Sequence, residues 1–180
     1  SEEDIVASLN GVYTSLTQSY VADNYHYFTD VRANATVVTN SGANSGIPYQ
    51  FYNYTLTEEN VYVYNRYSQL YKIISRANTL FAHLGDVSYA TPSARDTYEA
   101  EARFLRALSY YWLVTEWGDV PLVLKVLEST EEVRANNYRR PKAEIYQAIF
   151  DDLKYVTESP LLDVQPASAC GKVSKAAAWA

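Results

Sequence analysis

The sequence contains no methionine, one cysteine and only two histidines among its 180 residues. The single cysteine, Cys170, excludes an internal disulfide and a thiolate metal cluster. His26 and His83 share no motif, and a zinc site would need further ligands at suitable spacing. No Gly-rich loop for a phosphate or a dinucleotide is present. The sequence therefore predicts no metal, no cofactor and no catalytic constellation.

Positive charge and long apolar runs are also scarce. Lys and Arg number 15 against 21 Asp and Glu, which gives a net charge of −6. This balance opposes binding to nucleic acid or to an anionic membrane surface, because both need a basic face. No apolar run approaches the ~20 residues that span a bilayer. Because the chain starts at Ser1 without a Met, we expect that a signal peptide or tag has been removed and that any membrane anchor lies outside these residues.

What the sequence has in abundance is tyrosine, with 18 Tyr against 5 Phe. A hydrophobic content of 48% and a charged content of 20% predict one globular domain over residues 1–180. Tyrosine combines a flat apolar ring with a hydroxyl. It suits packing between partly hydrated elements, and it also suits binding of polar ligands with flat faces, such as sugars.

Apolar residues recur at helical spacing in five segments, and no strong strand signal is present. We expect helices at residues 2–20, 58–84, 92–117, 141–159 and from about 173 to the end. The predicted caps are Ser1, Thr57 and Thr91 followed by Pro92, and the predicted stops are Gly85, Gly118 and Pro160. The expected buried stripes are Ile5, Leu9, Val12 and Leu16; Val61, Tyr64, Tyr71, Ile74 and Phe81, widened by Leu70, Ala77 and Leu84; Phe104, Leu108, Tyr111 and Thr115, with Leu105 and Trp112 beside them; and Ile145, Ile149, Leu153 and Val156.

These helix pairs, with small residues such as Ala102 and Ala107 between them, resemble tetratricopeptide packing. The third and fourth helices start about 50 residues apart rather than ~34, so residues 118–140 form an insertion. The predicted fold is all-α, with tetratricopeptide-like antiparallel helix pairs and long irregular loops. Because the last helix is still running at Ala180, we expect the native chain to continue.

Several polar residues on these helices are expected to be structural. Asn78 is predicted to bridge to a neighbouring helix or backbone. Arg103 is predicted to pair with Glu99, and Arg106 to lie along its helix and donate to a loop carbonyl. Acidic neighbours such as Asp151 and Asp152 point in different directions, so we expect solvated helix faces rather than an acid–base couple.

Residues 20–56 break the helical pattern. The segment is rich in Asn, Gly, Ser and aromatic residues and shows no sustained period. A loop this long inside a compact domain is either functional or disordered, and its aromatic content argues against a simple flexible linker. It is therefore the first place to look for a binding site.

Six motifs, in order along the chain, resemble the SusD/RagB family of outer-membrane lipoproteins from Bacteroidetes. They are LNGVYTSL (9–16), Phe28-Thr29-Asp30, YKIISRANTLFAHL (71–84), EAEARFLRALSYYWLVTEWGDVPLV (99–123), RRPKAEIYQAIFDDL (139–153) and GKVSKAAAWA (171–180). In the last motif Lys172 stands where the family usually has Arg. Each motif alone is weak, and the ordered set is specific.

The resemblance implies a protein that binds and hands over its ligand without breaking bonds. Family members sit on the cell surface through a lipidated N-terminal Cys and cap a TonB-dependent transporter of the SusC type. They deliver glycans or, in some members, oligopeptides. The lipidated Cys, the signal peptide and the family's C-terminal half are missing from this chain. Two alternatives remain open, a peptide-binding helical-repeat scaffold and an all-α carbohydrate-active enzyme.

The resemblance also implies where ligand binds. In the starch-binding member, part of the site follows the Thr/Ser-Asp element, which corresponds here to residues 31–56. Candidate ligand-binding residues in this loop are Arg32, Asn34, Asn44, Tyr49, Phe51 and Tyr52, with Tyr54 beside them. Aromatic faces stack on the C–H surfaces of sugars, and Asn and Arg hydrogen-bond hydroxyls. The aromatic residues are equally compatible with tucking the loop onto the helices.

Overall fold

A computed structural model describes all 180 residues and is helical throughout, with one isolated bridge between Val120 and Arg140. The main helices are α1 (Glu2–Leu16), α3 (Val61–His83), α4 (Ala94–Trp117) and α6 (Lys142–Glu158). Shorter elements are the π-helix η1 (Tyr27–Val31), η2 (Ala43–Gly46), α2 (Tyr49–Tyr52), η3 (Leu84–Asp86), α5 (Thr130–Asn136), η4 (Ala167–Ala169) and α7 (Lys175–Trp179). The predicted all-α class is confirmed.

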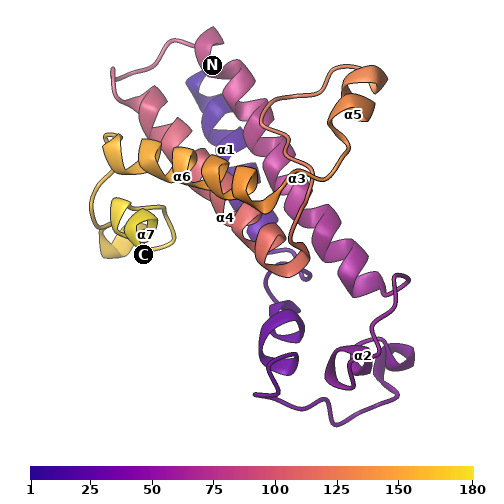
Figure 1. The fold of residues 1–180 in the computed structure, drawn as a ribbon. Coiled ribbons are helices and arrows are strands. Elements are labelled where there is room, and N and C mark those ends of the chain that lie inside the picture. Colours follow the sequence, from indigo (N-terminus) through magenta and orange to yellow (C-terminus); the bar gives the residue numbers. More distant parts are fainter.

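The long helices pack on their neighbours in sequence. Contacts join α1 to α3 and α4, α3 to α4, α4 to α6, and α6 to α7. Figure 1 shows α1, α3 and α4 side by side with alternating directions, while α6 lies across α4. The main core lies between α3, α4 and α6 and includes Leu70, Ile74, Leu105, Tyr110 and Ile145.

The first helix begins and packs as predicted. The side chain of Ser1 accepts a hydrogen bond from the Asp4 backbone N–H, and Asp4 completes the capping box. Such a box satisfies backbone donors that a helix start leaves unpaired. Ile5, Leu9 and Val12 are buried against α3 and α4. The helix ends at Leu16, four residues before the predicted limit.

The start and the buried face of α3 differ from the prediction. Asn60, rather than Thr57, caps the helix, and its side-chain oxygen accepts from the backbone N–H groups of Tyr62 and Val63. Leu70, Ile74, Ala77 and Leu84 of the predicted stripe are buried, whereas Val61 is 38% exposed and Tyr64 is 68% exposed. The helical period is correct, and the prediction is wrong only for the first turn of the stripe. The buried arc is centred further along the helix, where α1 and α4 both contact α3.

Helix α4 begins at Ala94 after Ser93 rather than after Thr91. Its buried face contains Leu105, which was expected beside the stripe, together with Tyr110 and Leu113, whereas Tyr111 of the predicted stripe is 50% exposed. Its end was predicted correctly. Gly118 follows the last helical residue with a φ of +74°, a conformation that glycine adopts without steric cost.

Elements in the second half of the chain are close to the prediction, with one addition. Helix α6 starts directly after Pro141 and ends before Pro160. The last helix, α7, starts at Lys175 rather than Val173, with Ser174 as its cap. The sequence did not predict α5, a seven-residue helix inside the 118–140 insertion.

A buried ion-pair network ties α3, α4 and α6 together. Arg106 forms two hydrogen bonds to Asp152, at 2.8 and 2.7 Å, and donates to Asn78 at 2.7 Å. Asn78 in turn donates to the carbonyls of Val123 and Lys125, which confirms its bridging role. Asp152 is only 2% exposed, so the prediction of a solvated face is wrong for this residue. A carboxylate can be buried here because two arginines neutralise it.

The predicted partners of the two arginines are also present. Arg103 pairs with Glu99 at 2.7 Å, as expected, and reaches Asp152 at 2.8 Å. Burial lowers the pKa of Arg103, but its bonds to Glu99 and Asp152 outweigh burial and the net pKa is raised. Arg106 donates to the carbonyl of Leu124 at 3.1 Å, the loop contact that was expected. The network therefore holds residues 123–125 against the helices.

Candidate functional site

Residues 20–56 fold into a small lobe at one end of the helical scaffold, below α3 in Figure 1. The core of the lobe consists of Val31 and Phe51, and Tyr62 of α3 packs with them. Phe28 meets Phe51 edge-on at 4.9 Å between ring centroids, and Tyr27 meets Tyr62 at 5.5 Å. Aromatic pairs at such distances and angles are favourable beyond the area that they bury. The excursion is therefore a packed unit.

One buried arginine of α3 fastens this lobe to the scaffold. The Arg66 side chain is fully buried and pairs with Glu116 of α4 through two hydrogen bonds, at 2.7 and 2.5 Å. It also donates to the backbone carbonyls of Tyr20 and Val21 at 3.0 and 3.3 Å. These bonds fix the point where the chain leaves α1 for the lobe.

Three aromatic rings surround the Arg66 guanidinium. Its carbon lies 5.0 Å from the ring centroid of Tyr25, 4.9 Å from Phe28 and 5.5 Å from Trp112. A cation within about 6 Å of a ring face is attracted by the electrons of that ring. Burial raises the pKa of Glu116, and the bonds from Arg66 oppose that rise. The lobe thus rests on a desolvated but paired charge.

The backbone of the lobe is strained in a localised way. Residues with positive φ other than glycine occur only here, at Asn34, Asn44, Ser45 and Tyr54, with φ between 46° and 61°. The Thr29-Asp30 element lies in the π-helix η1. Both features cost energy and concentrate at functional sites. They support the lobe as the candidate site.

The polar candidates line the exposed rim of the lobe. The side chains of Arg32, Asn34 and Asn44 are all exposed. Asn44 donates to the Tyr62 hydroxyl at 2.8 Å, so it also holds η2 against α3. The backbone carbonyl of Arg32 accepts from the Tyr54 hydroxyl at 2.7 Å, and Tyr54 is 60% exposed. Arg32 and Tyr54 are thereby brought together, although 22 residues separate them.

The aromatic candidates divide into two kinds. Tyr49 and Tyr52 are half-buried and pair at 5.5 Å between ring centroids, so each keeps part of its surface open to solvent. Phe51 is fully buried and cannot stack on a ligand. The prediction of Phe51 as a ligand-binding residue is therefore wrong: its ring packs against Phe28 and in the core with Val31 and Tyr62. Tyr54 takes its place as an exposed ring.

The rim places hydrogen-bonding side chains beside aromatic rings. It supplies one guanidinium, two amides and the edges of three tyrosines. No group of three or more His, Cys, Asp or Glu side chains in the structure could hold a metal ion. Shallow sites with aromatic faces and a few hydrogen-bonding groups are typical of reversible binding.

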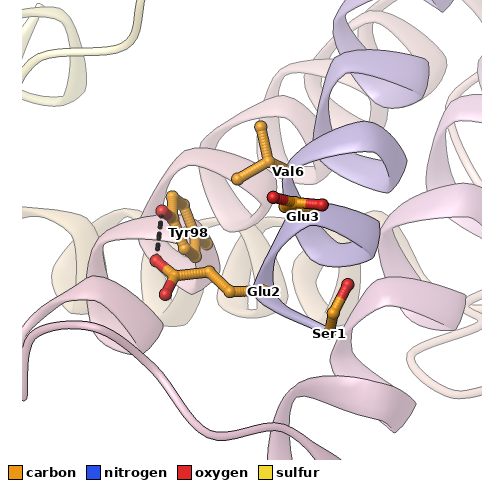
Figure 2. Close-up of a pocket in the computed structure, with 5 residues that line it drawn as sticks. All are labelled: Ser1, Glu2, Glu3, Val6 and Tyr98. Atoms are coloured by element: carbon orange, nitrogen blue, oxygen red, sulfur yellow. Dashed lines mark hydrogen bonds between the residues drawn. The ribbon is translucent and has the colours of Figure 1, made fainter.

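A hollow at the start of α1, shown in Figure 2, is lined by Ser1, Glu2, Glu3, Val6 and Tyr98. One of its two acids is already engaged, since Glu2 accepts from the Tyr98 hydroxyl at 2.8 Å and from the Ala90 backbone N–H at 2.7 Å. The bond to Glu2 and burial together raise the pKa of Tyr98. These contacts anchor the N-terminus of α1 to the loop before α4, and we assign them a structural role.

Comparison with known proteins identifies the family. A family model described as "Starch-binding associating with outer membrane", SusD-like, matches residues 1–180. The chain belongs to the SusD-like family. Two curated relatives from Formosa agariphila are SusD-like protein P2, 29% identical over 98% of this chain, and SusD-like protein P25, 27% identical over 99%. This SusD-like chain spans about a third of their length, 34% in each case.

Solved structures agree on the fold. A laminarin-binding SusD-like protein superposes with a TM-score of 0.82 at 26% identity, covering 98% of this chain and 38% of the other. Surface glycan-binding protein A from Bacteroides uniformis superposes with a TM-score of 0.85 at 21% identity, covering 99% of this chain and 40% of the other. The resemblance expected from the ordered motifs is confirmed. None of the helices is long and apolar enough to cross a membrane.

Proposed function

We propose that this SusD-like chain contributes to capture of nutrient glycans and binds them reversibly on the rim of the lobe at residues 32–54. The carrying observation is that a strained, aromatic-rich lobe presents Arg32, Asn34 and Tyr54 to solvent while Arg66 fixes its base. Membership of a family described as starch-binding, and likeness to a laminarin-binding protein, support a glycan as the ligand.

Delivery is the second part of the proposal. The bound glycan passes to a TonB-dependent outer-membrane transporter of the SusC type, and the full-length protein is a surface lipoprotein anchored by a lipidated N-terminal Cys. The family description places its members at the outer membrane, which supports this location. Co-purification of the full-length protein with a SusC-type transporter tests the partnership, and a full-length protein that purifies alone from native membranes contradicts it.

The ligand experiment is calorimetric titration of the chain with a panel of oligosaccharides. The panel contains laminarihexaose, maltohexaose, cellohexaose, an oligogalacturonide and, as the alternative ligand class, neutral oligopeptides. We expect binding of at least one oligosaccharide. Arg32→Ala should raise its Kd about fivefold or more, which corresponds to about 1 kcal/mol. Arg134→Ala, which removes another exposed arginine on α5, should leave the Kd unchanged.

The same mixtures test the absence of catalysis. Incubation with each oligosaccharide should yield no new reducing ends, because the rim holds no pair of carboxylates set across a sugar ring. New reducing ends would favour the carbohydrate-active enzyme. Binding of oligopeptides without any oligosaccharide would favour the peptide-binding scaffold.

A further inference from the structure

A second hollow, of about 330 Å³, lies between α3 and the segment 121–137 that carries α5. Its α3 wall consists of Tyr64, Tyr67, Ser68 and Tyr71. These positions follow the i, i+3, i+4, i+7 spacing of one helix face, so their side chains all point to the same side. The hollow lies outside the lobe and contains none of the candidate residues described above.

The three tyrosines of this wall differ in how firmly other residues hold their side chains. Tyr71 donates to the Pro121 carbonyl at 2.7 Å, and burial raises its pKa, so the ring is fixed and neutral. Tyr67 is half-buried and packs against Tyr71 at 4.9 Å and Trp117 at 5.2 Å. Tyr64 is 68% exposed. Two rings therefore build the wall, and the third is free to meet a ligand.

The opposite wall is apolar with a polar edge. Leu127 and Val133 form its apolar part, and the Asn137 amide lies at the edge. Glu132 of α5 accepts hydrogen bonds from the Lys125 ammonium and the Glu128 backbone N–H, which ties α5 to the preceding segment. That segment is joined to α3 by the bonds from Asn78 to the carbonyls of Val123 and Lys125.

The absence of charge from the lining of the hollow indicates which class of ligand fits it. No residue that lines the hollow is charged, although 20% of the chain is Asp, Glu, Lys or Arg. A phosphate, a uronic acid or a charged peptide would be desolvated there without a partner, at a high cost in free energy. Aromatic and aliphatic surfaces beside an exposed phenol, a Ser hydroxyl and an amide match a neutral ligand with both C–H faces and hydroxyls.

We propose that this hollow is a second binding site, which holds one neutral sugar unit of an oligosaccharide. Tyr64 stacks on the C–H face of the sugar, while Ser68 and Asn137 hydrogen-bond its hydroxyls. The saccharide class rests on the proposed function of the lobe, whereas the location rests on the hollow alone. Trp117 packs against Tyr67 of the hollow and against Phe28 in the core of the lobe, so the hollow adjoins the base of the lobe. A chain held at both sites gains affinity from the raised local concentration of its second unit.

The test maps binding by the shifts of backbone amide resonances. The isotope-labelled chain is titrated with laminarihexaose, maltohexaose and cellohexaose. We expect at least one of these neutral sugars to shift resonances in residues 64–71 and 127–137. Tyr64→Ala should raise the Kd at these resonances about fivefold or more, and Tyr64→Phe should keep most of the affinity because it keeps the ring. Tyr111→Ala, an exposed tyrosine of α4 outside both sites, is the matched control and should change nothing.

The outcomes separate this site from the lobe. Shifts at 64–71 that persist in Arg32→Ala support an independent second site. Shifts confined to residues 32–54 overturn the second site and leave the proposed function intact. Saturation of the hollow by the oligogalacturonide alone, or by an oligopeptide alone, overturns the neutral saccharide as its ligand. Absence of any shift with all three neutral sugars also overturns it, whatever binds at the rim.

Discussion

Replacement of Arg66 by Met tests whether one buried charge holds the lobe on the scaffold. The change removes both hydrogen bonds to Glu116 and both bonds to the carbonyls of Tyr20 and Val21. Met keeps a side chain of similar length, so little empty volume should result. What remains is a carboxylate on α4 that is 12% exposed and has lost its partner.

The magnitude follows from these contacts. Removal of one member of a buried ion pair typically costs about 3–5 kcal/mol, because the other charge stays buried alone. For a chain of this size, that loss lowers Tm by on the order of 10 °C. The loss of stability should be smaller than a sum over the lost hydrogen bonds, because Glu116 can take up a proton and become neutral. We therefore expect the free energy of unfolding to fall by about 3 kcal/mol or more.

The pH dependence of this stability loss tests the role of Glu116 more directly than its size does. Burial already raises the pKa of Glu116, and loss of Arg66 should raise it further. A carboxyl with a raised pKa in the folded state binds more protons there than in the unfolded state, so its contribution to stability falls as pH rises through that pKa. The deficit of Arg66→Met relative to the original chain should thus be smaller at pH 5 than at pH 7.

The assay is urea denaturation at both pH values, with Glu116→Leu and the double variant as partners. The double variant should lose less stability than Arg66→Met, because it leaves no buried charge without a partner. A loss below about 1 kcal/mol for Arg66→Met, the size of an exposed pair, would refute the anchoring role. Equal deficits at pH 5 and pH 7 would refute the assignment to Glu116.

Two further predictions concern the insertion and the scaffold beneath it. Asn78→Ala should lower the free energy of unfolding, measured with urea, by about 2–3 kcal/mol, because it leaves the buried Arg106 and two carbonyls short of a partner. The control is Thr79→Ala, which changes the neighbouring exposed residue. It should lower the free energy of unfolding by less than about 1 kcal/mol, as surface substitutions do. The hydrogen bond from Lys125 lowers the pKa of Glu132 below its ordinary value of 4.5. The ionised Glu132 therefore stabilises α5 above pH 4.5, and this stabilisation is lost as pH falls through the lowered pKa. Helical chemical shifts of residues 130–136 should hold from pH 8 to about pH 5 and decline below about pH 4, whereas in Glu132→Gln they should not respond to pH.

Hydrophobic period was enough to find the long helices but not every residue that they expose. In α3 and α4 the apolar and aromatic residues cover more than one face, so several stripes fit the same period. Tyr64 and Tyr111 were assigned to the core on that basis and are exposed. Which stripe is buried depends on how many neighbours cover the helix, and this is settled by tertiary packing. The full extent of the buried face therefore could not be obtained from the local sequence.

Short elements and special backbone conformations escaped prediction for another reason. Helix α5 has seven residues and α2 has four, which is too short for a period to appear. Asn34 and Asn44 adopt positive φ, which Asn tolerates better than most residues, but many asparagines never do so. The sequence thus indicates where strain is possible, and only the packed lobe shows where it occurs.

The sequence could single out residues 31–56 as a candidate segment, but not which of its side chains face solvent. The structure exposes Arg32 and Asn34, and their role in binding stays a prediction. Phe51 and Tyr54 look equivalent in sequence, yet one is fully buried and the other is 60% exposed. The tyrosine hydroxyl offers a partial signal, because a phenol needs water or a partner whereas Phe does not.

Two buried arginines explain how irregular segments can be rigid enough to bind. Arg66 holds the carbonyls of Tyr20 and Val21 at the base of the lobe, and Arg106 holds the carbonyl of Leu124 at the base of the 118–140 insertion. Neither segment has helical bonds there to satisfy its backbone, so a buried guanidinium with several fixed donors supplies them. Each arginine is itself fixed by a carboxylate on another helix. The geometry of both proposed sites is thereby set from inside the helical scaffold, which is what a binding surface built on loops requires.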